Sequence, residues 1–211
     1  MYIRTDCIVL SRKNFNEADR ILTLYSREYG KISCLAKGIR RPTSRKSGHV
    51  EVGNWCKVFI AKGKNLDLLT EAELKKTFGT KDLTPQKAAN IFHLLELVDQ
   101  LTEINQKNRE VFALLVNSLT RIEEGEDFSL ISAVFKTKLL CALGFFSVAN
   151  FKSSGARDLI KILEEDNFEN IKKRLVISSD SYLKLLSFLD SIIESLTERK
   201  LKTARFVNGQ L

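Results

Sequence analysis

The chain has 211 residues, of which 44% are hydrophobic and 28% are charged, as in a globular protein with one large domain or two small ones. No apolar run approaches the roughly 20 residues that a membrane-spanning helix needs. The N-terminus MYIRTDCIVL lacks the basic-then-apolar layout of a signal peptide, so we expect a cytoplasmic protein without a membrane partner.

The net charge of +8 is concentrated in the first part of the chain. Residues 1–80 hold 16 of the 34 Lys and Arg residues but only 8 of the 26 Asp and Glu residues. Between Glu28 and Glu51 there are six bases and no acid. This asymmetry predicts a polyanionic partner, which by charge alone could be DNA, RNA or an anionic membrane.

Five strands are predicted in the first 78 residues. The run after Gly30 shows the two-residue period of a strand, because Ile32, Cys34 and Ala36 share one face. A polar turn, RKNFNEAD (12–19), separates the first two strands, and Gly30 suits the tip of the next hairpin. The predicted strands are 2–11, 20–26, 31–38, 50–61 and 66–76.

The stretch KGIRRPTSRK (37–46) interrupts this pattern. Pro42 lacks an N–H and restricts Arg41 before it, so the stretch is predicted to be a loop. Its bases are Lys37, Arg40, Arg41, Arg45 and Lys46. Lys and Arg neutralise phosphates, and Arg adds bidentate contacts, so these five residues are candidate nucleic-acid contacts, together with Arg12 and Arg20 beside the first turn.

Residues from Pro85 onward follow a helical period. Thr84 is a plausible N-cap with Pro85 in the first helical position. Apolar stripes predict helices, among them one stripe of Ile91, Leu94, Leu95, Val98 and Leu101 and another of Val111, Leu115, Leu119 and Ile122. The predicted helical segments after these are 128–143, 155–166, 167–175 and 179–200.

These elements predict an α+β protein with two domains. The strands of residues 1–80 are best packed as a small β-barrel, of which the five-stranded OB-fold is an example that binds oligonucleotides. Residues 81–211 form an all-α domain. Five aromatic residues interleave with the bases of the barrel and could stack on nucleic-acid bases or fill the core: Phe15, Tyr25, Tyr29, Trp55 and Phe59.

The sequence offers little for catalysis or metal binding. It has no phosphate-cradling glycine loop, no HExxH and no GxSxG motif. His49 and His93 are far apart, and the second is predicted to be a partly buried or surface helix residue. The four cysteines form no CxxC pair and are expected to be buried hydrophobes: Cys7, Cys34, Cys56 and Cys141.

The N-terminal run CIVLSRKNFNEADRILTLYSREYGKISCLAKGIRRPTSRKSG resembles the N-terminal domain of the bacterial recombination mediator family RecO. The matching features, in order, are IVL, EADRILTLYSREYGK and AKGIRRPTSR. The later LLCALGFF is similar to the LL..LG(Y/F) helix end of that family. The resemblance implies an N-terminal OB-fold, a helical C-terminal domain and no enzymatic activity. The family has a KG.RR..SR run, and the basic residues that match it here are Lys37, Arg40, Arg41 and Arg45. The resemblance implies that these four residues are the leading candidates for DNA contact.

The resemblance also implies a function and partners. RecO-like proteins bind single- and double-stranded DNA, anneal complementary strands and act with RecR and, in many bacteria, RecF. They help RecA load onto DNA covered by single-strand-binding protein, whose acidic, apolar tail docks on the helical domain. FKTKLL (135–140) and IKKRL (171–175) combine apolar and basic residues as such a docking groove requires, although helix packing explains their apolar members as well.

One departure from the family concerns metal. Many members carry a four-cysteine zinc site shortly after the LG helix end, but FFSVANFKSSGARDLIKIL contains no cysteine. We therefore expect neither a metal nor another cofactor. Two other functions stay open from the residues alone. One is an RNA-binding OB-type barrel with a helical interaction module, and the other is a nuclease, for which no carboxylate or histidine set stands out.

Overall fold

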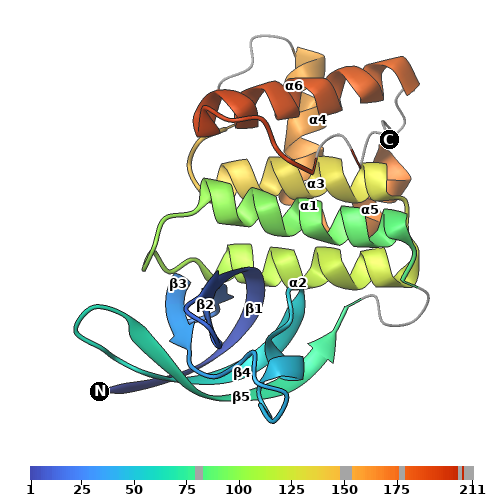
Figure 1. Ribbon diagram of the computed structural model, residues 1–211. Coiled ribbons are helices and arrows are strands. Elements are labelled where there is room, and N and C mark those ends of the chain that lie inside the picture. Colours follow the sequence, from blue (N-terminus) through green and yellow to red (C-terminus); the bar gives the residue numbers. More distant parts are fainter. Residues whose placement is uncertain (79–82, 148–153, 176–178, 204–205, 207–211) are drawn as a thin grey trace.

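The computed structural model describes residues 1–78, 83–147, 154–175, 179–203 and 206. It is an α+β structure in which helices stack on one side of a β-barrel (Figure 1). The strands are β1 (Tyr2–Phe15), β2 (Asp19–Ser26), β3 (Gly30–Ala36), β4 (Asn54–Ala61) and β5 (Asp67–Thr77), with a single 3₁₀ turn, η1 (Ser47–Val50). The helices are α1 (Pro85–Leu101), α2 (Arg109–Glu124), α3 (Phe128–Ala142), α4 (Ser154–Glu165), α5 (Phe168–Arg174) and α6 (Ser179–Thr197).

The five strands close into a barrel in the order β1-β2-β3-β5-β4, which is the OB-fold predicted from the sequence. Closure uses a short parallel contact in which Cys34 and Leu35 of β3 pair with Asp67 and Leu68 of β5. Alternate residues point inward, so that Ile32, Cys34 and Ala36 are buried in the barrel interior as predicted.

The predicted turn at residues 12–19 is wrong in its extent. β1 continues to Phe15, because Arg12, Lys13 and Asn14 pair with residues of β2. Only residues 16–18 form the turn, with Asn16 at a φ of 49°. Residues 12–15 are polar or exposed, so composition favoured a loop, but cross-strand hydrogen bonding extends the hairpin beyond the barrel core. Arg12 and Arg20 therefore lie on strands.

The helical predictions are confirmed for α1, α2 and α3. The Thr84 hydroxyl accepts a hydrogen bond from the Lys87 N–H at 3.2 Å, and Pro85 is the first residue of α1. Both predicted apolar stripes are buried. The predicted boundary between domains 1–80 and 81–211 falls within residues 79–82, which lie outside the described residues.

The barrel and the helices share a hydrophobic core. Ile8, Leu10, Tyr25 and Phe78 of the barrel pack with buried residues of the helices. The segment between α1 and α2 adds polar contacts to β3, because the Asn105 N–H donates to the Lys31 carbonyl at 2.8 Å. The two parts are thus joined by both apolar packing and backbone hydrogen bonds.

Candidate nucleic-acid interface

The predicted loop at residues 37–46 is irregular, as expected, and it is anchored at both ends. Gly38 has a φ of 65°, a left-handed conformation that turns the chain away from β3. Ile39 follows and is buried in the barrel core, as is Val50 at the end of η1. Two apolar anchors thus hold this polar segment against the barrel.

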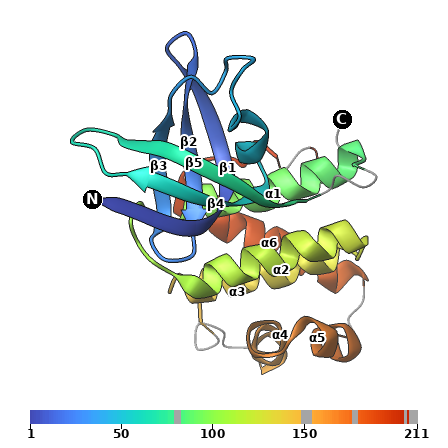
Figure 2. The same cartoon turned by 90° about the horizontal axis from the view of Figure 1, so that it is seen from below.

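Hydrogen bonds tie the start of this loop to the β1–β2 turn. The Gly38 N–H donates to the Asp19 carboxylate at 2.7 Å, and the Arg40 N–H donates to the Ala18 carbonyl at 2.9 Å. The Arg40 guanidinium also donates to the Glu17 carbonyl at 3.0 Å. Figure 2 shows the tip of the β1–β2 hairpin and this loop projecting side by side from the barrel.

The end of the loop is tied to β5. The Lys46 ammonium donates to the carbonyls of Leu69 and Thr70 at 3.2 and 3.3 Å. His49 Nδ1 lies 2.7 Å from the carbonyl of Ala72, to which it donates as the only possible donor of the pair. The predicted phosphate-contact residue Lys46 therefore has a structural role here and is the least available base of the loop.

Three bases of the loop point into solvent. Lys37, Arg41 and Arg45 are exposed. Within the described residues, no polar protein partner engages their side chains. These charges are fully available to a ligand, and the rigid anchors around them keep them in place. Exposed guanidinium groups suit phosphate oxygens, to which they donate two parallel hydrogen bonds.

Arg12 and Arg20 lie on the neighbouring hairpin and converge on one acid that the sequence analysis did not single out. Arg12 Nη1 pairs with Glu51 Oε2, and Arg20 Nη1 lies 3.6 Å from Glu51 Oε1. The only sequence signal for Glu51 is that it ends the acid-free stretch. We call residues 12–20 and 37–51 together the basic end; it contains eight Lys and Arg residues and three Asp and Glu residues.

The structure separates the five aromatic candidates. Tyr25 is fully buried against the helices, and Trp55 packs edge-on against Phe112 at 6.3 Å between ring centroids. These two belong to the shared core. Phe59 lies under the Arg4 guanidinium at 4.8 Å. Phe15 and Tyr29 are each 37% exposed, and of these Phe15 belongs to the basic end, where its partner Asp19 anchors the loop.

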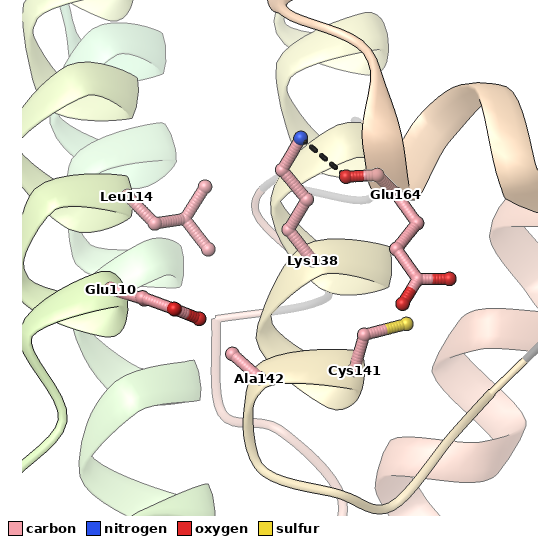
Figure 3. Close-up of a pocket in the computed structure, with 6 residues that line it drawn as sticks. All are labelled: Glu110, Leu114, Lys138, Cys141, Ala142 and Glu164. Carbon is pink, nitrogen blue, oxygen red and sulfur yellow. Dashed lines mark hydrogen bonds between the residues drawn. The ribbon is translucent and has the colours of Figure 1, made fainter.

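A second candidate site is a cleft of about 300 Å³ between α2, α3 and α4 (Figure 3). Lys138 donates to the carbonyls of Glu164 and Asp166 at 2.7 and 2.9 Å and so caps the end of α4. Burial, aided by the adjacent Glu164 carboxylate, raises the pKa of Cys141 to about 12. A thiol is a poor nucleophile until it ionises, so Cys141 is unsuited to nucleophilic chemistry. The hydrogen bonds of Lys138 stabilise the helix junction.

The predicted docking stretch FKTKLL does not form an exposed groove. Phe135, Lys136, Thr137, Leu139 and Leu140 are all buried in α3, because this helix is central to the bundle. In the second predicted stretch, IKKRL, Ile171 is also buried, whereas the three bases of the stretch are exposed. No three His, Cys, Asp or Glu side chains within the described ranges are grouped to hold a metal. No helix in the described part of the chain could cross a membrane.

Comparison with known proteins gives consistent matches. The family model described as recombination protein O N terminal matches residues 1–78, and that described as recombination protein O C terminal matches residues 83–158. A DNA repair protein RecO of Pelotomaculum thermopropionicum is 34% identical over 145 residues, which are 69% of this chain and 56% of the relative.

Two further relatives carry the same name. The protein of Caldicellulosiruptor bescii is 35% identical over 144 residues, which cover 68% of this chain and 59% of the relative. The protein of Desulforamulus reducens is 26% identical over an alignment that covers 97% of this chain and 93% of the relative. The chain thus spans 56–59% of the first two relatives and nearly all of the third.

Proposed function

Because this chain belongs to the RecO family of DNA repair proteins, we propose that it is a non-enzymatic mediator that binds single- and double-stranded DNA and anneals complementary strands. The observation that carries the proposal is the basic end of the barrel. Two segments that are separate in sequence meet there, and Lys37, Arg41 and Arg45 are exposed without protein partners among the described residues.

The chemistry of this surface suits the phosphate backbone. Each Lys or Arg that neutralises a phosphate releases condensed counterions, and the resulting gain does not depend on base sequence. The anchors at Ile39 and Val50 hold the loop in place, so that little conformational entropy is lost when DNA binds. Phe15 is the aromatic side chain that is exposed at the same end and can stack on a base.

A mechanism for annealing follows from charge. Two single strands repel one another through their phosphates, and a basic surface that holds both strands screens this repulsion. Base pairing then supplies the free energy, and the protein acts by concentrating and aligning the strands. Such a role requires no nucleophile, general base or metal.

The proposed partners follow from the family. We place the protein in the cytoplasm with RecR, with RecF as a further partner, and with DNA covered by single-strand-binding protein, where it would help RecA to load. The three exposed bases of IKKRL, Lys172, Lys173 and Arg174, remain a candidate contact for the acidic tail of single-strand-binding protein.

Replacing Arg41 and Arg45 together with Ala tests the interface. We expect binding to a short oligothymidylate to weaken by roughly tenfold or more at low salt, because two phosphate contacts are lost. For the parent, the slope of the logarithm of the binding constant against the logarithm of the salt concentration should be near −3.5 for about five phosphates. The magnitude of this slope should decrease by about 0.7 for each lost contact. Fluorescence anisotropy at several salt concentrations measures both quantities.

The matched control replaces two exposed bases of the helical part, Lys161 and Lys200, with Ala. The control keeps the same net charge as the test variant and should bind DNA like the parent. Equal binding by all three proteins would place the interface elsewhere.

Competition with an RNA of the same sequence distinguishes the RNA-binding alternative, and a strand-annealing assay with and without single-strand-binding protein tests the mediator role.

A further inference from the structure

Glu51 occupies a position between two arginines of the proposed interface. Its Oε2 pairs with Arg12 Nη1, and its Oε1 lies 3.6 Å from Arg20 Nη1. The side chains of Arg12, Arg20 and Glu51 are 36%, 21% and 45% exposed. The group is therefore accessible to a ligand from solvent, and its charges face one another in the free protein.

The backbone holds this carboxylate in place. Glu51 follows the buried Val50, and its carbonyl accepts a hydrogen bond from the Asn54 N–H at 3.0 Å. The buried Asn54 amide donates in turn to the carbonyls of Gly48 and His49 at 3.0 and 3.1 Å. The acid is thus fixed to the frame of the barrel, whereas the arginines reach it through long flexible side chains.

Arg20 is also held from a second direction. Its Nε donates to the Asn14 side-chain oxygen at 3.3 Å across the β1–β2 hairpin. Arg12 and Arg20 therefore differ from Lys37, Arg41 and Arg45, which have no partner among the described residues. The basic end contains one set of bases that is ready for phosphate and another set that is occupied by an acid.

We infer that Glu51 is an electrostatic latch that keeps Arg12 and Arg20 from DNA until a phosphate displaces its carboxylate. This inference rests on the proposed function. A phosphate oxygen and a carboxylate oxygen compete for the same guanidinium N–H groups. Because solvent-exposed ion pairs contribute little, a phosphate brought in by the ready bases is sufficient to open the latch. Glu51 thereby lowers the affinity for DNA and makes release easier, as suits a protein that must hand its strand on.

Glu51→Gln tests the latch because it removes the charge and keeps the size of the side chain. We expect this variant to bind a short oligothymidylate roughly threefold to tenfold more tightly at low salt, with the gain shrinking as salt rises. The charge-matched control is Glu124→Gln, at an exposed position at the end of α2. It should change binding much less, because the carboxylate that pairs with Arg12 and Arg20 is that of Glu51 and not that of Glu124.

A double-mutant cycle separates the latch from a general effect of charge. In a protein carrying Arg12→Ala and Arg20→Ala, the gain from Glu51→Gln should fall to the level of the control. A gain that persists in this background, or no gain in the parent, overturns the latch. If the Arg41→Ala, Arg45→Ala protein binds like the parent, the proposed interface itself has failed, which is a different outcome.

A measurement on the unmodified protein guards against effects of the variants on folding. The side-chain Nε–H signals of Arg12 and Arg20 in an NMR spectrum should shift when the oligothymidylate is added, because both guanidinium groups exchange a carboxylate for phosphates. Signals that stay in place while the protein binds DNA contradict the latch.

Discussion

Replacing Gly30 with Ala is expected to destabilise the protein by roughly 3–5 kcal/mol, for two reasons that act together. Gly30 has a φ of 70°, which is unfavourable for a residue with a side chain. A Cβ atom at this position would also lie 1.8 Å from the carbonyl oxygen of Gln106. That oxygen belongs to the backbone and cannot move alone, so the segment between α1 and α2 must shift away from β3.

The shift would break several contacts between the barrel and the helices. The Asn105 N–H bond to the Lys31 carbonyl is adjacent, and the Lys31 ammonium donates to the Asp99 carbonyl at 2.6 Å. Urea unfolding, followed by the fluorescence of Trp55 at the shared core, measures the loss. Since Gly30 lies at the opposite end of β2 and β3 from the basic end, DNA binding by the folded fraction should be retained.

Two control variants separate strain from overlap. Gly125→Ala introduces the left-handed strain alone, because Gly125 has a φ of 81° but no atom lies near a Cβ there, and it should cost about 1 kcal/mol. Gly48→Ala introduces neither effect and should change the free energy of unfolding by less than about 0.5 kcal/mol. A Gly30→Ala protein no less stable than Gly125→Ala would show that the overlap is relieved without cost.

His93 is expected to make the protein less stable in acid. It is buried in α1, and its Nδ1 lies 2.8 Å from the Thr203 hydroxyl oxygen. That hydroxyl donates its proton to a Glu96 carboxylate oxygen at 2.5 Å, so it accepts from the imidazole. The proton of neutral His93 is therefore on Nδ1, and Nε2 is buried without a hydrogen-bond partner among the described atoms.

Burial and the nearby Lys136 ammonium lower the pKa of His93 from 6.5 to about 3. The unfolded chain takes up a proton at the higher value and the folded protein only at the lower one. The contribution of neutral His93 to the free energy of unfolding is therefore fully present above pH 6.5 and is lost as the pH falls toward 3. The loss amounts to about 1.4 kcal/mol per pH unit and up to about 5 kcal/mol in full.

Urea unfolding at a series of pH values checks this expectation. The free energy of unfolding of a His93→Gln protein should depend less on pH than that of the parent, by an amount that corresponds to up to one bound proton. The pH dependence that the carboxylates cause is the same in both proteins. An NMR titration of the imidazole signals gives a direct reading. If the His93 ring becomes protonated near its ordinary pKa while the protein stays folded, the ring is not buried as in this structure.

The sequence alone predicted the class of the fold and much of its detail. Period-two alternation in the run 31–38 and helical stripes such as Ile91, Leu94 and Leu95 depend on near neighbours in the chain, so they are visible without coordinates. The cap formed by Thr84 and Pro85 is equally local. The loop at 37–46 followed from Pro42 and from its charge.

One prediction, the extent of the turn at 12–19, was wrong, and two questions could not be answered from the sequence. Arg12, Lys13 and Asn14 form strand pairs that their polar composition disfavours, since the partners in β2 supply the hydrogen bonds. Trp55 and Tyr25 pack against helices that begin many residues later. The buried state of the FKTKLL stretch likewise depends on helices that surround α3, and a single stripe cannot indicate how many neighbours a helix has.

The sequence by itself determined that this protein has a barrel, a helical part and a concentration of positive charge in the loop at 37–46. Only the tertiary structure decided which bases of the basic end are available to a ligand. Lys46 bonds to β5, Arg12 and Arg20 face Glu51, and Arg41 and Arg45 remain in solvent. Charge and local conformation are properties of short segments, whereas an ion pair between β1 and Glu51 exists because the pairing of β1 with β4 brings distant segments together.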